Sequence, residues 1–213
     1  MEKKIVADNG NIKKIVEDEI KRLGNKADLN HIDVSDVTNM WSLFEGSDFN
    51  GDISNWNVGN VEGMAYMFEN SQFNGDISKW NVGNVENMDF MFYKSKFNQD
   101  ISKWDVGNVV DMSSMFFNSK FNQDISNWDV SNVENMYSMF NGSAFNGDIS
   151  NWNVGNVKNM YNMFEDSIFD KNIDMWNYNF KLAEEEPWSF ELKTKGSYTL
   201  IEKYVKALEN KKF

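Results

Sequence analysis

A 24-residue period in the aromatic residues constrains this chain more than any other feature of its sequence. Phenylalanine stands at positions 49, 73, 97, 121, 145 and 169, and a period of this length is typical of proteins built from stacked repeats. Five full copies run from Phe49 to Ile168, and partial copies precede and follow them. We therefore predict one repeat solenoid over residues 29–176, whose core grows along its axis.

Each copy contains two patterns of apolar residues. In the second copy, residues 76–82 are β-branched and aromatic in a short run, which predicts a strand. Val85, Met88, Met91 and Phe92 then fall on one face at helical spacing, and Asn84 precedes them as a candidate N-cap. The expected fold class is an α/β repeat solenoid, leucine-rich-repeat-like, with one short strand and one short helix per repeat.

Both ends of the chain are predicted to be helical caps over the open ends of the stack. Residues 1–28 form the N-terminal cap, with a helix from near Asn11, whose side chain caps it, to Gly24 in a left-handed conformation. Residues 177–213 form the C-terminal cap. Its helix, about 199–211, begins with Thr199 and Glu202 at capping-box spacing.

Large apolar residues recur in register, which predicts continuous core ladders rather than a carbohydrate or peptide platform. Methionines, whose thioethers pack adaptably, are expected to fill the same core and not to bind a metal. The ladders comprise Trp56, Trp80, Trp104, Trp128, Trp152 and Trp176, with Met64, Met88, Met112, Met136 and Met160, and Met67, Met91, Met115, Met139 and Met163.

Two polar ladders accompany them. The asparagines are expected to hydrogen-bond backbone groups at each turn. The aspartates place like charges one repeat apart, so they must accept backbone hydrogen bonds, be well solvated or hold cations. The glycine-rich pattern of calcium-binding β-rolls is absent, and we predict no metal site and no cofactor. The ladders are Asn60, Asn84, Asn108, Asn132 and Asn156, with Asp36 in the first partial copy, and Asp52, Asp76, Asp100, Asp124 and Asp148.

The net charge of −12 lies in the repeats, because residues 29–168 carry 6 basic and 19 acidic side chains. Such a body repels nucleic-acid phosphates, so we expect no direct nucleic-acid binding and a protein partner with a basic surface. The same charge also serves solubility alone.

Several classes of protein are disfavoured. The chain has no cysteine, no apolar run of membrane-spanning length and no apolar segment at its start that resembles a signal peptide. We expect it to be cytoplasmic as written, or at the cell surface or secreted if a leader was removed. We do not expect an enzyme, because the one histidine, His31, has no nucleophile at a recognisable spacing, and no phosphate loop, metal motif or triad signature is present.

The repeat unit F-N-x-D-I-S-x-W-x-V-x-N-V-x-x-M-x-x-M-F resembles that of the BspA-like leucine-rich-repeat surface proteins, as does the entry segment DLNHIDVSDVTNM. The resemblance covers residues 28–176. It implies a leucine-rich-repeat solenoid of bacterial origin and a role in adhesion, and it supplies no catalytic residues.

Positions that vary between copies are the candidates for binding. Aromatic residues are frequent at the two positions after the first methionine of each copy and at the position after its Met-Phe pair. These positions are not among the fixed apolar positions that form the core. The alternative is that they partly bury against neighbouring repeats. The candidate partner-binding residues are Trp41, Tyr66, Phe90, Tyr93, Phe117, Tyr137 and Tyr161, with Lys79 and Lys103 on a second, more polar face.

Two functions from different classes follow. The first is a non-catalytic protein-binding module, adhesin-like or a scaffold, that uses the variable surface. The second is an intracellular acidic inhibitor of phage or mobile-element type, whose repeat body blocks a nucleic-acid-binding or defence enzyme.

Overall fold

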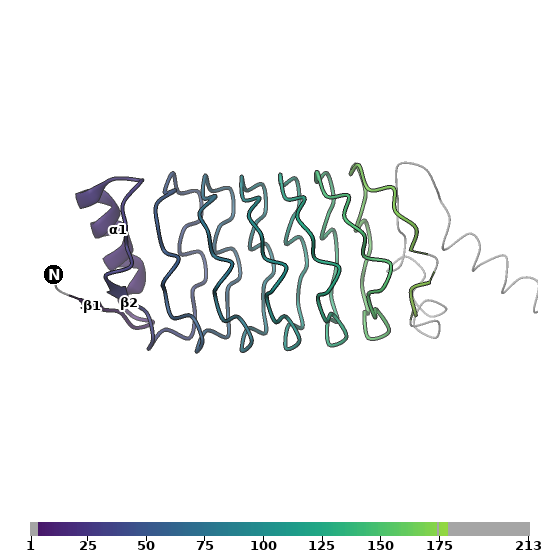
Figure 1. The fold of residues 1–213 in the computed structure, drawn as a ribbon, viewed down its shortest axis with the longest axis horizontal. Helices are drawn as coiled ribbons and strands as arrows, with labels where there is room; N and C mark the ends of the chain where they lie inside the picture. Colours follow the sequence, from purple (N-terminus) through teal and green to yellow (C-terminus); the bar gives the residue numbers. More distant parts are fainter. Residues whose placement is uncertain (1–3, 174, 179–213) are drawn as a thin grey trace, which may run out of the picture.

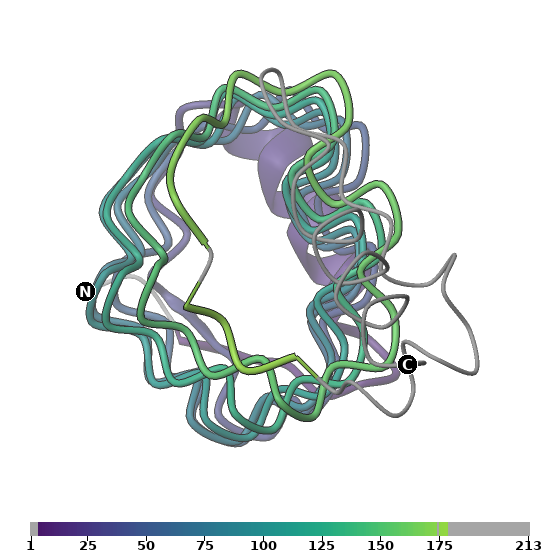
Figure 2. The ribbon, with the colours of Figure 1, turned by 90° about the vertical axis from the view of Figure 1, so that its right-hand side faces the viewer.

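The computed structural model describes residues 4–173 and 175–178 of the chain. Within this part the backbone winds into successive coils that stack side by side along the long axis of the molecule (Figure 1). Viewed along that axis, the coils overlay one another closely (Figure 2). Parallel bridges join residues 24 apart, from Asn39–Gly63 to Asn135–Asn159. The predicted 24-residue period is therefore confirmed, and we call the stacked coils the repeat body.

The interior of the repeat body is filled by columns of side chains with the same repeat position. The six tryptophans from Trp56 to Trp176 are only 3–4% exposed, and Trp56 and Trp80 stack with ring centroids 6.4 Å apart. Both methionine columns are also buried. Each fully buried side chain of this size contributes about 1.5–3 kcal/mol. The prediction that these ladders form the core is confirmed. Two columns of stacked phenylalanines complete it: Phe49, Phe73, Phe97, Phe121, Phe145 and Phe169, and Phe44, Phe68, Phe92, Phe116, Phe140 and Phe164.

The predicted strand and helix of each repeat are wrong. In the described coils the backbone forms turns and single-residue bridges in their place. Met88 and Phe90 donate their N–H groups to the carbonyls of Asp111 and Ser113 in the next coil, both at 2.9 Å. The N–H of Met91, which follows Phe90, instead donates to the Met88 carbonyl at 3.2 Å, which closes a turn. Alternate N–H groups thus bond between and within coils, whereas a helix would use them all internally.

A left-handed residue in each coil explains this pattern. The second position after the first methionine has a φ between 52° and 60° in six successive coils, including the bulky residues Tyr66 and Phe90. This conformation interrupts an α-helix and costs about 1–2 kcal/mol for a side chain that is not glycine. The apolar residues therefore have helical spacing in the sequence, but the backbone that carries them forms successive turns instead of a helix. The left-handed residues at this position are Ser42, Tyr66, Phe90, Ser114, Ser138 and Asn162, and a second left-handed residue follows four positions later in each of these coils: Gly46, Asn70, Lys94, Asn118, Gly142 and Asp166.

The N-terminal segment covers the first coil, as Figure 1 shows. Helix α1 spans Ile12–Leu23, which confirms the predicted helix, and it buries Ile12 and Val16 in the core. Gly24 ends it with a φ of 91°. The predicted side-chain cap is wrong: Asn11 makes no capping bond, because its Oδ1 accepts the N–H of Asp8 at 2.8 Å.

A two-stranded parallel sheet, which the sequence did not predict, ties the chain terminus to the repeats. Strand β1 (Ile5–Val6) pairs with β2 (Ile32–Asp33), with Ile5 opposite Ile32. The predicted C-terminal cap helix at about 199–211 lies outside the described residues.

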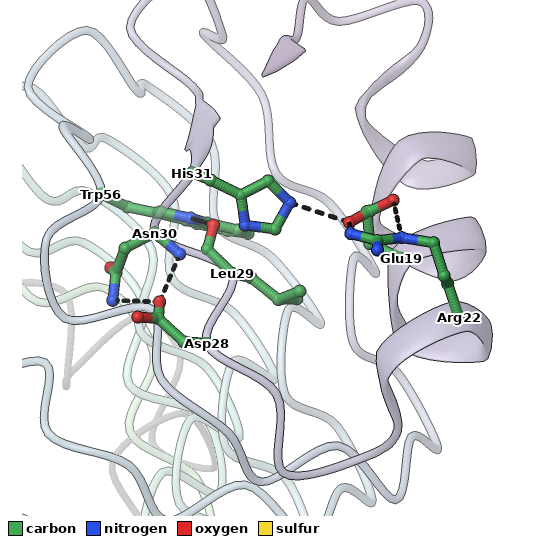
Figure 3. Close-up of polar contacts among 7 residues, drawn as sticks. All are labelled: Glu19, Arg22, Asp28, Leu29, Asn30, His31 and Trp56. Atoms are coloured by element: carbon green, nitrogen blue, oxygen red, sulfur yellow. Dashed lines mark hydrogen bonds and ion pairs between the residues drawn. The ribbon is translucent and has the colours of Figure 1, made fainter. Parts of the chain in front are cut away.

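A hydrogen-bonded network joins α1 to the start of the repeat body. Figure 3 shows the carboxylate of Glu19 between Arg22 and His31, with distances of 2.5 Å to Arg22 Nη2 and 2.8 Å to His31 Nε2. The hydrogen bond from Arg22 is the main reason why the pKa of Glu19 falls to about 2. Nearby, Trp56 donates its indole N–H to the Leu29 carbonyl at 3.0 Å. His31 therefore has a structural position.

The polar ladders bond the backbone. Asn84 Nδ2 donates to the Gly59 carbonyl of the preceding coil at 2.6 Å, and its equivalents from Asn60 to Asn156 do the same. This confirms the predicted backbone bonding of the asparagines. Each ladder aspartate accepts the N–H of the serine two residues later; Asp100 does so at 2.9 Å from Ser102, and this bond lowers its pKa.

Candidate partner-binding face

The aromatic face consists of the seven aromatic residues that the sequence singled out as variable between copies. None of them is fully buried: Trp41 is 63% exposed, Tyr137 is 40% exposed, and the other five are half-buried. They therefore differ from the core tryptophans in environment as well as in repeat position. The aromatic face is Trp41, Tyr66, Phe90, Tyr93, Phe117, Tyr137 and Tyr161.

A repeated turn positions the outermost of these side chains. The side-chain oxygen of an Asn or Asp accepts the backbone N–H two residues later, which is an Asx turn. Asn39 accepts from Trp41 at 2.9 Å, and Asn135 accepts from Tyr137 at 3.1 Å. Since the methionine between them is buried, its neighbours lie at the surface of the coil.

Five of the seven rings are in continuous contact. Tyr66 and Phe90 stack with centroids 4.7 Å apart and planes 3° from parallel, and Tyr93 and Phe117 stack at 4.8 Å. Phe90 joins these two pairs at 5.3 Å. Trp41 meets Tyr66 edge to face at 6.4 Å. Four successive copies thus contribute to one aromatic surface.

Tyr137 and Tyr161 form a separate pair, with ring centroids 6.1 Å apart. Between the two groups, the equivalent positions hold the small residues Ser113 and Ser114, which are buried. The structure therefore divides the aromatic face into an N-terminal group of five rings and a C-terminal group of two. The alternative considered above was that these aromatic residues are partly buried. It applies to the five half-buried side chains, Tyr66, Phe90, Tyr93, Phe117 and Tyr161.

The two lysines predicted on the second face, Lys79 and Lys103, interact with ladder aspartates rather than with the rings of the aromatic face. Lys79 and Lys103 are both exposed, and their charges act on the pKa values of Asp76 and Asp100. A different lysine lies against the aromatic face: Lys94 Nζ is 5.0 Å from the centroid of the Tyr93 ring. The aromatic face therefore already holds one cation over a ring.

Acidic groups make the aromatic face electrostatically negative. Burial, followed by the charge of Asp111, raises the pKa of Asp89. Burial and the charge of Asp89 raise the pKa of Tyr66 in turn, and burial and Glu45 raise that of Glu69. Burial, the largest cause of each shift, disfavours a charge of either sign, whereas the smaller contributions of Asp111, Asp89 and Glu45 come from negative charges, which attract a cation.

Sequence reasoning missed the acidic and small residues beside the rings. Glu62, Gly63 and Ala65 are near Tyr66 in the sequence, but they come beside Trp41, and Glu86 and Asp89 come beside Tyr66, because the coils stack. One signal was present in the sequence: two positions of one copy hold unusually small residues. The missed residues are Glu62, Gly63, Ala65, Glu86 and Asp89.

The chemistry of the face is that of a contact surface. Among residues 4–173 and 175–178, no group of three or more His, Asp or Glu side chains is placed to hold a metal ion. None of the helices in this part of the chain is long and apolar enough to cross a membrane.

The fold and the site define a repeat protein in which stacked 24-residue coils bury their fixed aromatic residues and expose variable ones. The model of the family described as "Mycoplasma protein of unknown function, DUF285" matches residues 11–120 and again residues 94–187, and the chain belongs to this family. No curated protein and no solved structure matches the chain.

Proposed function

We propose that this chain is a non-catalytic protein-binding module, adhesin-like or a scaffold, which contacts its partner through the aromatic face. The observation that carries the proposal is the continuous run of rings from Trp41 to Phe117 at positions that the core does not use. Aromatic anchors surrounded by less critical contacts dominate the free energy of most protein interfaces.

The rigidity of the repeat body supports this proposal. Because the stacked columns beneath the rings are buried and the backbone bonds run between coils, the rings are held in place before a partner arrives. Preorganisation of this kind lowers the entropic cost of binding. We further propose that the repeat body is a leucine-rich-repeat solenoid of the BspA-like type. The sequence of its repeat unit and the stacked coils of its backbone are consistent with this fold.

The test is a comparative pull-down followed by titration of the purified captured protein. We expect Tyr137→Ala with Tyr161→Ala to weaken binding at least about tenfold, the loss of roughly one hot-spot contact. The melting temperature of this double variant should differ little from that of the original chain, because Tyr137 is exposed and Tyr161 is half-buried. Ile168→Ala removes an exposed apolar side chain outside the aromatic face and is the matched control.

Equal affinity of the tyrosine variant and the Ile168 control would contradict the use of the C-terminal pair. The same experiment with Lys79→Ala and Lys103→Ala tests the second face. If only the lysine variants lose binding, the partner contacts that face and the proposed site is wrong.

The acidic inhibitor remains a second candidate, favoured by the negative groups around the face and by the excess of 13 acidic over basic side chains in residues 29–168. It predicts that the captured protein is a nucleic-acid enzyme and that high salt releases it, since exposed charge pairs are screened. An interface dominated by the rings would instead survive high salt.

A further inference from the structure

A hollow of about 610 Å³ lies at the N-terminal end of the aromatic face, between the first coils. Trp41 and Tyr66 contribute aromatic surface to it, and Glu62, Glu86 and Asp89 contribute three carboxyl groups. Of the described residues that line it, none is basic. Its size is in the range of small-molecule and side-chain binding sites.

Two small residues open this hollow. Gly63 stands where the other copies have Asn39, Asn87, Asp111, Asn135 and Asn159. Ala65 stands where three other copies have the aromatic residues Trp41, Tyr137 and Tyr161 and two have Asp89 and Ser113. The two small residues lie in the middle of the lining, and the adjacent copies carry the larger residues Asn39 and Trp41 on one side and Asn87 and Asp89 on the other.

The N-terminal segment fixes one end of the hollow. Asn9 Oδ1 accepts the N–H of Thr38 at 2.9 Å, and Asn9 Nδ2 donates to Thr38 Oγ1 at 2.8 Å. Both residues are part of the lining. The hollow thus lies where the cap meets the first coil, and its shape is set by hydrogen bonds on that side.

The aromatic and acidic groups around the hollow complement a cation. A positive side chain over a ring gains about 0.5–2 kcal/mol, more where water is excluded. The Asp89 carboxyl has one oxygen, Oδ1, that is buried without a hydrogen-bond partner in the structure. Such a group is destabilised unless a donor reaches it or its charge is neutralised. Lys94 over Tyr93 shows the same pairing on the adjacent coil.

We propose that this hollow binds the positively charged side chain of an arginine or lysine presented by the protein partner, with its stem against Trp41 and Tyr66 and its charge toward Glu62, Glu86 and Asp89. This inference rests on the proposed function, because it takes the cation to be part of a protein. It adds the chemistry of the contact and its place at one end of the aromatic face.

The test uses the tripeptide N-acetyl-Gly-Arg-Gly-amide as the probe and the whole chain as the receptor. The readout is the NMR resonance of the Trp41 indole N–H, assigned with a Trp41→Phe variant. The control ligand replaces arginine by citrulline, which keeps the shape and removes the charge. We expect the arginine peptide to shift this resonance to saturation, and the citrulline peptide to bind about tenfold more weakly.

Two sets of variants locate the site. Gly63→Asn with Ala65→Tyr fills the hollow with the residues of other copies, and we expect at least about a tenfold loss of peptide affinity. Glu62→Gln with Glu86→Gln keeps the shape of two exposed side chains and should also weaken binding. Ile168→Ala removes an exposed apolar side chain outside the aromatic face and should leave peptide binding unchanged.

The inference is overturned if the arginine and citrulline peptides shift the Trp41 resonance equally, if neither shifts it, or if the filled variant binds as well as the original chain. These outcomes are separable from failure of the proposed function. If the peptide fails while the captured partner still needs Tyr137 and Tyr161, only the hollow is excluded. If the peptide binds in the hollow while no variant of the aromatic face affects a protein partner, the proposed function fails instead.

Discussion

The indole N–H of Trp80 donates a hydrogen bond to the backbone carbonyl of Ile53, 27 residues earlier, at 3.1 Å. Equivalent bonds of 2.8–3.1 Å recur at every tryptophan from Trp56 to Trp176. Each one crosses between coils inside the core, so the tryptophan ladder supplies directional bonds as well as apolar area. These bonds fix the register of one coil on the next.

Trp104→Phe should therefore destabilise the chain strongly. The change leaves the buried Ile77 carbonyl without its donor and removes part of a packed ring, at a cost of about 2–4 kcal/mol. Urea denaturation measures the loss. Trp41→Phe is the control, because Trp41 is exposed and should change stability by less than about 0.5 kcal/mol. Similar curves for the two variants would contradict the assignment of core and surface.

Tyr66→Asn should preserve or raise stability. Tyr66 has a φ of 60°, a conformation that asparagine adopts more readily than bulky residues. The relief of about 1 kcal/mol offsets the stacking lost with Phe90. Thermal melting measures the result. A fall in melting temperature as large as that of Trp104→Phe would show that Tyr66 is a core residue and would remove it from the proposed face.

Gly63→Asn alone should stabilise the chain by about 1 kcal/mol. The new side chain supplies the Ala65 N–H with the Asx-turn acceptor that the other copies have, and it restricts the unfolded chain. A Cβ at Gly63 would lie 3.3 Å from Asn39 Oδ1, which must move by a few tenths of an ångström while it keeps its hydrogen bond from the Trp41 N–H. Denaturation of this variant checks the prediction. Marked destabilisation would contradict the prediction and would mean that crowding against Asn39 outweighs the new hydrogen bond.

Glu19→Gln should destabilise the chain at pH 7 and have little effect near pH 2. The pKa of Glu19 is about 2 in the folded chain, below its ordinary value of 4.5, chiefly because Arg22 donates to it. A lowered folded pKa means that the stabilisation is complete above about pH 4.5 and is lost as the pH falls toward 2. We expect about 1–3 kcal/mol at pH 7.

The measurement for Glu19 is the difference in unfolding free energy between the original chain and the variant at each pH, which cancels the titration of other carboxylates. Glu17→Gln, an exposed change on the same helix, is the control and should have little effect at either pH. A pH-independent difference for Glu19→Gln would show that its ion pairs do not stabilise the fold.

The core and the N-terminal helix could be predicted because both depend on periodicity alone. Repeats of 24 residues place each tryptophan beside the next, and Ile12 and Val16 share one face of any helix through them. The helix expected at Val85–Phe92 failed because its spacing is also satisfied by successive turns. Which pattern forms is decided by hydrogen bonds to the next coil, such as Phe90 to Ser113, and these are not local.

The candidate site was predictable in composition and not in arrangement. Trp41 and Tyr137 are exposed, as expected for residues at repeat positions that do not form the core. The division into two groups depends on buried Ser113 and Ser114, and the hollow depends on Asn9 meeting Thr38 across 29 residues. β1 was missed because Ile5–Val6 is too short to give a strand pattern and forms only with its partner β2.

The most direct test of this account is hydroxyl-radical footprinting of the aromatic side chains, with and without the captured partner. In the free chain we expect Trp41 and Tyr137 to be oxidised readily, and the ladder residues Trp80 and Trp104 to be protected. The partner should then protect the aromatic face and leave the oxidation of exposed Met175 unchanged. Protection of Met175 without protection of Trp41 or Tyr137 would contradict the claim that the variable aromatic residues are the binding surface.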